Sequence, residues 1–100
     1  MIFNTSASGG GTNVKTATSL PESGTPLAVD TIYNVSAAVD TYSFNAPTSG
    51  WAHGTFTTGS SASVSFSGTF LGAAPTIEAS KTYEFDVHNG VWAVQEVVIA

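Results

Sequence analysis

Two histidines, His53 and His88, are the only side chains in this sequence whose ordinary pKa suits a base near neutral pH. A hydrolase also needs a nucleophile and an orienting group within reach of its base. The sequence has no Gly-x-Ser-x-Gly segment that would present a serine on a strand-to-helix turn. We therefore interpret both histidines as solvent-exposed strand residues, and we predict that the chain is not an enzyme.

Metal ligands are equally sparse. There is no cysteine, and the seven acidic residues are dispersed, whereas zinc prefers Cys or several His and calcium loops need clustered carboxylates. Glu84, Asp86 and His88 do alternate along one predicted strand, but such a row is typical of any solvated strand face. The glycine run at 9–11 is followed by no Lys-Ser/Thr pair, so it does not indicate a phosphate loop. We predict neither a metal site nor a cofactor.

The two tryptophans, Trp51 and Trp92, leave two interpretations open. If they lie together at the surface, they could stack on the rings of a host surface glycan. If they are buried, they fill the core or a subunit interface, which we favour because the chain has few other large side chains.

Charge excludes two classes of partner. Only nine residues are charged, the net charge is −5, and Lys15 and Lys81 are the only cations. A nucleic acid or an anionic membrane surface needs a basic footprint that this chain lacks. No apolar run approaches the roughly 20 residues that span a bilayer. Ser and Thr together supply 27 residues, so we expect an uncharged surface rich in hydroxyl groups.

The beginning of the sequence predicts an arm. Residues 1–25 are rich in Gly, Ser and Thr, a composition that buries too little apolar surface to fold alone. We expect a flexible arm. Its apolar triplet, Met1, Ile2 and Phe3, is either a frayed terminus or inserts into a pocket on another chain. The triplet lacks the features of a signal peptide, so we expect synthesis in the cytoplasm.

Residues 26–100 alternate with a period of two and show no helical period. We predict strands at 27–35, 41–45 and 51–58, with Gly54 at a bulge or bend. After a break at Gly59-Ser60-Ser61 another strand follows, with Ala62, Val64 and Phe66 inward and serines outward. Asn89-Gly90 between alternating residues predicts a terminal hairpin. The fold class is therefore all-β, a small antiparallel β-sandwich or a jelly-roll-like domain. A domain this small, without disulfides, favours a homo-oligomer, with three subunits as the first choice.

Residues 75–92 resemble the closing hairpin of small structural proteins of tailed bacteriophages. Pro75 and Ile77 lie in a loop, Lys81-Thr82-Tyr83-Glu84 opens a strand, and Asn89-Gly90 turns into a final strand. Residues 32–44 resemble these proteins more loosely.

The resemblance implies a virion setting and no catalytic residues. The hairpin resembles those of head-fibre, capsid-decoration and tail-fibre modules alike, so two functions stay open. The first is a decoration protein that binds the major capsid protein or another virion protein through its N-terminal arm. The alternative is a carbohydrate- or receptor-binding module of a tail fibre.

Overall fold

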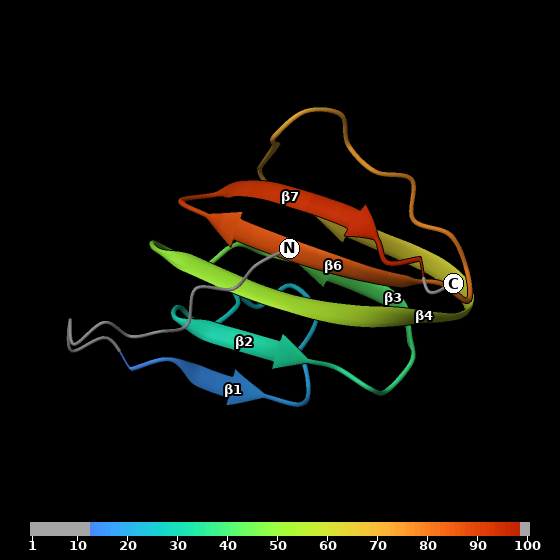
Figure 1. The fold of residues 1–100 in the computed structure, drawn as a ribbon, viewed down its shortest axis with the longest axis horizontal. Coiled ribbons are helices and arrows are strands. Elements are labelled where there is room, and N and C mark those ends of the chain that lie inside the picture. Colours follow the sequence, from blue (N-terminus) through green and yellow to red (C-terminus); the bar gives the residue numbers. More distant parts are fainter. Residues whose placement is uncertain (1–12, 99–100) are drawn as a thin grey trace.

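The computed structural model describes residues 13–98 (Figure 1). This part of the chain contains seven β-strands and no helix. The strands are β1 (Lys15–Ala17), β2 (Thr31–Asn34), β3 (Val39–Phe44), β4 (Trp51–Phe66), β5 (Thr69–Phe70), β6 (Thr82–His88) and β7 (Val91–Glu96). The predicted all-β class is thereby confirmed. Met1, Ile2 and Phe3 lie outside the described residues.

The strands form one mixed sheet in the order β1-β2-β4-β6-β7-β5, and β3 pairs with β4 away from this row. Only the β4–β6 and β6–β7 pairs are antiparallel. The pairs β1–β2, β2–β4, β3–β4 and β5–β7 are parallel. The prediction of an antiparallel domain was wrong in this respect, because alternation along a strand does not reveal the direction of its neighbour.

β4 is the longest strand, and it changes partners along its length. Its first half pairs with β2 and β6, and its second half pairs with β3. The predicted break at Gly59-Ser60-Ser61 is wrong, since these residues belong to β4. Gly59 lies where the partner changes, and a Cβ atom there would clash with the carboxylate of Asp40. Asp40 is exposed and its carboxylate can move, so the position does not require glycine, and Gly59 does not end the strand.

Gly54 is likewise not at a bulge. It pairs in register with Tyr33 on β2 and with Phe85 on β6. A Cβ atom at Gly54 would lie 2.6 Å from the carbonyl oxygen of Tyr33 and 2.8 Å from the ring of Phe85. The strand needs glycine here because a backbone and an aromatic ring approach it closely.

The core lies between the main sheet and β3, which runs behind β4 and β6 in Figure 1. Phe44 on β3 is fully buried. The distances from its ring centroid are 5.0 Å to Phe56 on β4, 5.2 Å to Phe85 on β6 and 6.0 Å to Trp92 on β7. One side chain thus joins three strands of the sheet to the strand that covers them.

The terminal hairpin is confirmed. A two-residue loop connects β6 to β7, and both of its residues have positive φ, 51° at Asn89 and 81° at Gly90. Positive φ at both positions is what a type I′ turn requires. Tyr83, Phe85 and Val87 are buried, as predicted.

Residues 13–25 do not form a free arm. β1 pairs in parallel with β2, and Leu20 packs against the core. The hydroxyl of Tyr42 donates to the carbonyl of Pro21 at 2.6 Å, and the Gly24 N–H donates to the carbonyl of Ser43 at 3.0 Å. The predicted boundary between residues 25 and 26 is therefore wrong, because backbone hydrogen bonds bind this polar segment to the domain.

Candidate binding surface

The outer face of the main sheet brings together four side chains that could take part in binding or chemistry. Because side chains alternate along a strand, Trp51 and His53 on β4 share this face, as do Asp86 and His88 on β6. The β4–β6 register places Trp51 opposite His88 and His53 opposite Asp86. We call these four residues the outer-face cluster.

Contacts within the cluster are close. The Nδ1 atom of His53 lies 3.2 Å from Oδ1 of Asp86, and the ring centroids of Trp51 and His53 are 4.9 Å apart at an angle of 47°. The His53 side chain is 17% exposed. Burial lowers the pKa of His53, and the negative charge of Asp86 partly opposes that shift. The imidazole is therefore neutral at pH 7.

The cluster combines side chains that can form hydrogen bonds with the aromatic ring of Trp51. A His–Asp pair also occurs in hydrolases, where the Asp orients the His and the His is the base that activates a nucleophile.

The hydroxyls of Thr57 and Thr82, farther along the same face, are 2.9 Å apart and hydrogen bonded to each other. Within residues 13–98, no three His, Cys, Asp or Glu side chains gather closely enough to hold a metal ion.

Trp92 is not part of this surface. It is fully buried, lies on the inner face of β7, and its Nε1–H donates to the carbonyl of Ser67 at 2.6 Å. Its ring centroid lies 5.0 Å from that of Phe66. Trp51, in contrast, is half-buried on the opposite face. The interpretation in which both tryptophans meet at the surface is therefore wrong, and Trp92 is a core residue.

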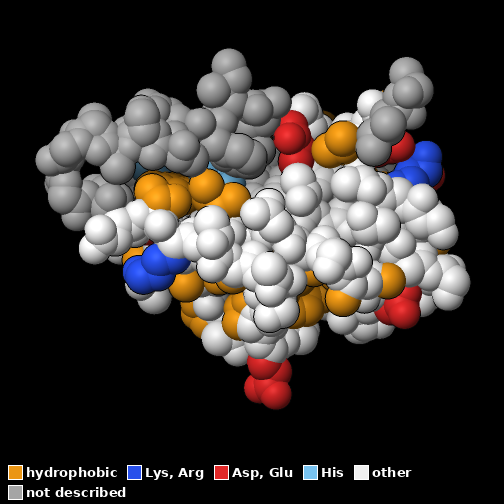
Figure 2. Space-filling view, turned by 60° about the horizontal axis from the view of Figure 1, so that its bottom comes forward, with side chains coloured by type: hydrophobic (Ala, Val, Ile, Leu, Met, Phe, Trp, Pro, Cys, Tyr) orange, Lys and Arg blue, Asp and Glu red, His pale blue; other side chains and the backbone are white. Residues whose placement is uncertain are grey.

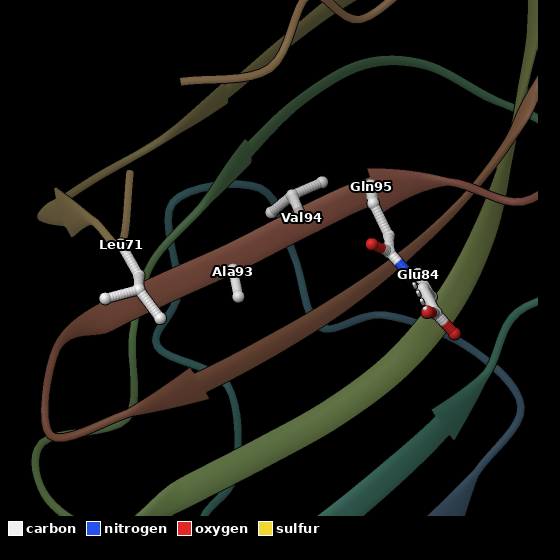
Figure 3. Close-up of a pocket in the computed structure, with 5 residues that line it drawn as sticks. All are labelled: Leu71, Glu84, Ala93, Val94 and Gln95. Carbon is white, nitrogen blue, oxygen red and sulfur yellow. Dashed lines mark hydrogen bonds between the residues drawn. The ribbon is translucent and has the colours of Figure 1, made fainter. Parts of the chain in front are cut away.

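A shallow groove borders the outer face beside β7 (Figure 3). Its volume is about 290 Å³, and Leu71, Glu84, Ala93 and Gln95 are among its lining residues. Gln95 Nε2 donates to Oε1 of Glu84 at 2.6 Å, which links β7 to β6. Leu71 is 75% exposed. Sequence reasoning missed this groove, because the loop that carries Leu71 over β7 is not marked by any periodicity.

A second groove of about 260 Å³ lies where residues 19–21 meet residues 35–42. Leu20, Val35, Val39 and Tyr42 supply its apolar part. Burial raises the pKa of the Tyr42 phenol to about 12, because the charged phenolate would lose its water. Tyr42 therefore remains a neutral hydrogen-bond donor here.

A third surface carries only hydroxyl groups. Thr41 and Ser43 on β3 lie opposite Ser63 and Ser65 on β4, and all four are exposed. The hydroxyl of Ser65 donates to that of Ser43 at 3.3 Å. We call these four residues the hydroxyl face. The predicted outward serines after residue 62 are confirmed.

Charged groups are few on the described surface. Figure 2 shows one side of the molecule, on which most side chains are uncharged and only a few Lys, Asp and Glu side chains are visible. Lys81 is held between two carboxylates, with its Nζ 3.4 Å from Glu78 and 3.5 Å from Glu96. Hydrogen bonding to Glu78, together with the charges of both carboxylates, raises the pKa of Lys81.

No protein-family model, curated protein or solved structure matches this chain. Among residues 13–98, no helix has the length and hydropathy needed to cross a membrane.

Proposed function

We propose that this chain is a structural protein of a tailed-bacteriophage virion, of the capsid-decoration or head-fibre type. The observation that carries the proposal is the hydroxyl face of β3 and β4. An uncharged surface of short hydroxyl side chains produces little repulsion between neighbouring subunits and loses little side-chain entropy on contact. Such a surface suits a protein that is packed in many copies on a shell.

We further propose that the domain belongs to the β-sandwich or jelly-roll-like group. The position of β3 and of the second half of β4 across the inner face of the main sheet supports this classification. Two layers of strands that share an aromatic core are the common feature of these folds.

The proposed partner is the major capsid protein or another virion protein, and the proposed assembly is a homotrimer. Met1, Ile2 and Phe3 are the proposed anchor on the shell. Burial of Ile2 or Phe3 contributes up to about 1.5–3 kcal/mol each, before ordering entropy is subtracted. Because residues 13–25 belong to the domain, the anchor and its tether are confined to residues 1–12.

Co-sedimentation with undecorated capsids tests the proposal. The full-length protein is compared with a chain lacking residues 1–12 and with the double variant Ser63→Lys/Ser65→Lys, which adds two charges to the hydroxyl face. Gln95→Lys on the outer face is the matched control. We expect both altered proteins to bind less and the control to bind normally. Equal binding by all four proteins would refute both docking elements.

A second function, carbohydrate or receptor binding in a tail fibre, is favoured by the outer-face cluster. Trp51 can stack on the apolar face of a sugar ring, and Asp86 can accept hydrogen bonds from its hydroxyl groups. Binding of fluorescently labelled protein to purified host-surface polysaccharide tests this function. Trp51→Ala should abolish binding, and Val91→Ala, on the same face, should not. Equal binding by the two variants would exclude the cluster as a glycan site.

A further inference from the structure

The turn between β6 and β7 places an exposed asparagine directly before a glycine. Asn89 is exposed and has a φ of 51°, and Gly90 has a φ of 81°. Nothing lies within 4 Å of the position that a Cβ atom of Gly90 would occupy. The Cα atom of Gly90 is therefore uncrowded on that side, while the Gly90 carbonyl accepts a hydrogen bond from the Thr69 N–H at 3.3 Å.

The side-chain amide of Asn89 is held by a second loop. The Asn89 N–H donates to the carbonyl of Gly50 at 2.8 Å, and the Gly50 N–H donates to Oδ1 of Asn89 at 3.3 Å. A donor on Oδ1 withdraws electron density from Cγ and stabilises the negative charge that develops on Oδ1 when a nucleophile adds to Cγ. The Gly50 N–H makes a long hydrogen bond of 3.3 Å that can shorten as this charge develops.

We infer that Asn89 is a site of self-modification, at which its side chain is converted to a carboxylate in the folded protein. The backbone nitrogen of Gly90 loses its proton to solvent and attacks Cγ of Asn89. The new N–Cγ bond closes a five-membered succinimide, the Cγ–Nδ2 bond breaks, and ammonia leaves. Water then opens the ring at either carbonyl, giving aspartate or isoaspartate at position 89. One water is consumed and one ammonia is released.

Neighbouring residues make the reaction selective. The other asparagines of the described part precede residues with a Cβ atom, in Asn13-Val14, Asn34-Val35 and Asn45-Ala46. A Cβ atom, above all the branched Cβ of valine, crowds the attacking nitrogen. These three residues are therefore internal controls for Asn89.

The two products have different structural consequences. Aspartate keeps the acceptor for the Gly50 N–H and adds a negative charge, which strengthens that hydrogen bond. Isoaspartate inserts an additional carbon into the main chain of a two-residue loop, so the pairing of His88 with Val91 loses its geometry. Because His88 lies opposite Trp51, the modification also alters one end of the outer-face cluster.

Time-resolved peptide mapping of the full-length protein in mildly alkaline buffer, with a parallel sample in urea, tests the inference. We expect Asn89 to convert in the folded protein at a rate within the same order of magnitude as in urea, while Asn13, Asn34 and Asn45 remain intact. Asn89→Asp is the chromatographic standard for the aspartate product. Gly90→Ala should slow conversion severalfold.

The folded and urea-treated samples together make the inference falsifiable without any variant. An Asn89 that stays intact in the folded protein while it converts in urea would mean that the turn protects the amide, which overturns the inference. Conversion of Asn45 as fast as Asn89 in the folded protein would overturn it as well.

Discussion

Phe44 is the residue at which the two layers of the protein meet. Its ring packs against Phe66 with a centroid distance of 4.8 Å and nearly parallel planes, in addition to its contacts with the main sheet. We expect Phe44→Ala to lower the free energy of unfolding by about 3–5 kcal/mol, because it removes a large buried ring and leaves a cavity. Urea denaturation monitored by circular dichroism measures this loss.

The matched control for Phe44→Ala is Leu71→Ala. Leu71 is a large apolar residue but is 75% exposed, so its truncation should change the free energy of unfolding by no more than about 0.5 kcal/mol. If Leu71→Ala were as costly as Phe44→Ala, the assignment of the core to the space beneath β3 would be wrong.

His53 makes stability depend on pH. Burial lowers its pKa in the folded state below the ordinary histidine value of 6.5, so the unfolded chain binds more protons between the two values. The contribution of neutral His53 is therefore complete above pH 6.5 and is lost as the pH falls below 6.5 through the folded pKa. The slope from this group is at most about 1.4 kcal/mol per pH unit. Urea unfolding at a series of pH values should show the slope, and His53→Gln should flatten it.

At the scale of single elements, β4 depends on the absence of a side chain at Gly54. A Cβ atom there would meet the carbonyl of Tyr33 and the ring of Phe85 at under 3 Å. We expect Gly54→Ala to cost about 1–3 kcal/mol, as overpacking in a filled interior does. Ser63→Ala, an exposed change on the same strand, is the control. A neutral Gly54→Ala in thermal unfolding would contradict the close approach of β2 and β6.

The first residues of the described chain act as an element of the sheet. A chain that lacks residues 1–12 should retain the full-length melting temperature. Removing residues 1–25 deletes β1 and the hydrogen bond from Tyr42 to Pro21, and each such bond is worth about 1 kcal/mol. Calorimetry should therefore show a lower melting temperature only for the longer deletion. Equal melting temperatures would restore the interpretation of 1–25 as an independent arm.

The features that could be predicted from the sequence are those set by neighbouring residues. The β6–β7 hairpin depends on Asn89-Gly90 and on alternation on either side of it, and both can be read locally. The continuity of β4 depends on pairing with β3, a distant segment, so the turn-forming composition of Gly59-Ser60-Ser61 was misleading. β1 was missed for the same reason, since its polar residues gain their partners only in the sheet.

The candidate surface was predictable to the same extent. A period of two places Trp51 beside His53 and Asp86 beside His88, but the opposition of His53 and Asp86 requires the register between β4 and β6. The side of Trp92 likewise requires the register between β6 and β7, because Trp92 pairs with buried Val87. Single-strand patterns give no information on which faces of two strands coincide.

At the scale of the whole molecule, charge and surface chemistry favour assembly. The chain has a net charge of −5 spread over few groups, and the hydroxyl face carries no charge at all. A small domain without disulfides gains stability when subunits bury surface against one another. These features support the proposal that the protein is one of many identical copies on a shell.

The number of copies of the chain in purified virions tests the proposed role as a decoration protein. Quantitative mass spectrometry against isotope-labelled peptides of this protein and of the major capsid protein measures that number. A decoration protein should be present in hundreds of copies, in a fixed ratio to the capsid protein. A dozen copies or fewer would identify a tail component instead, and absence from the particle would contradict a structural role in the virion.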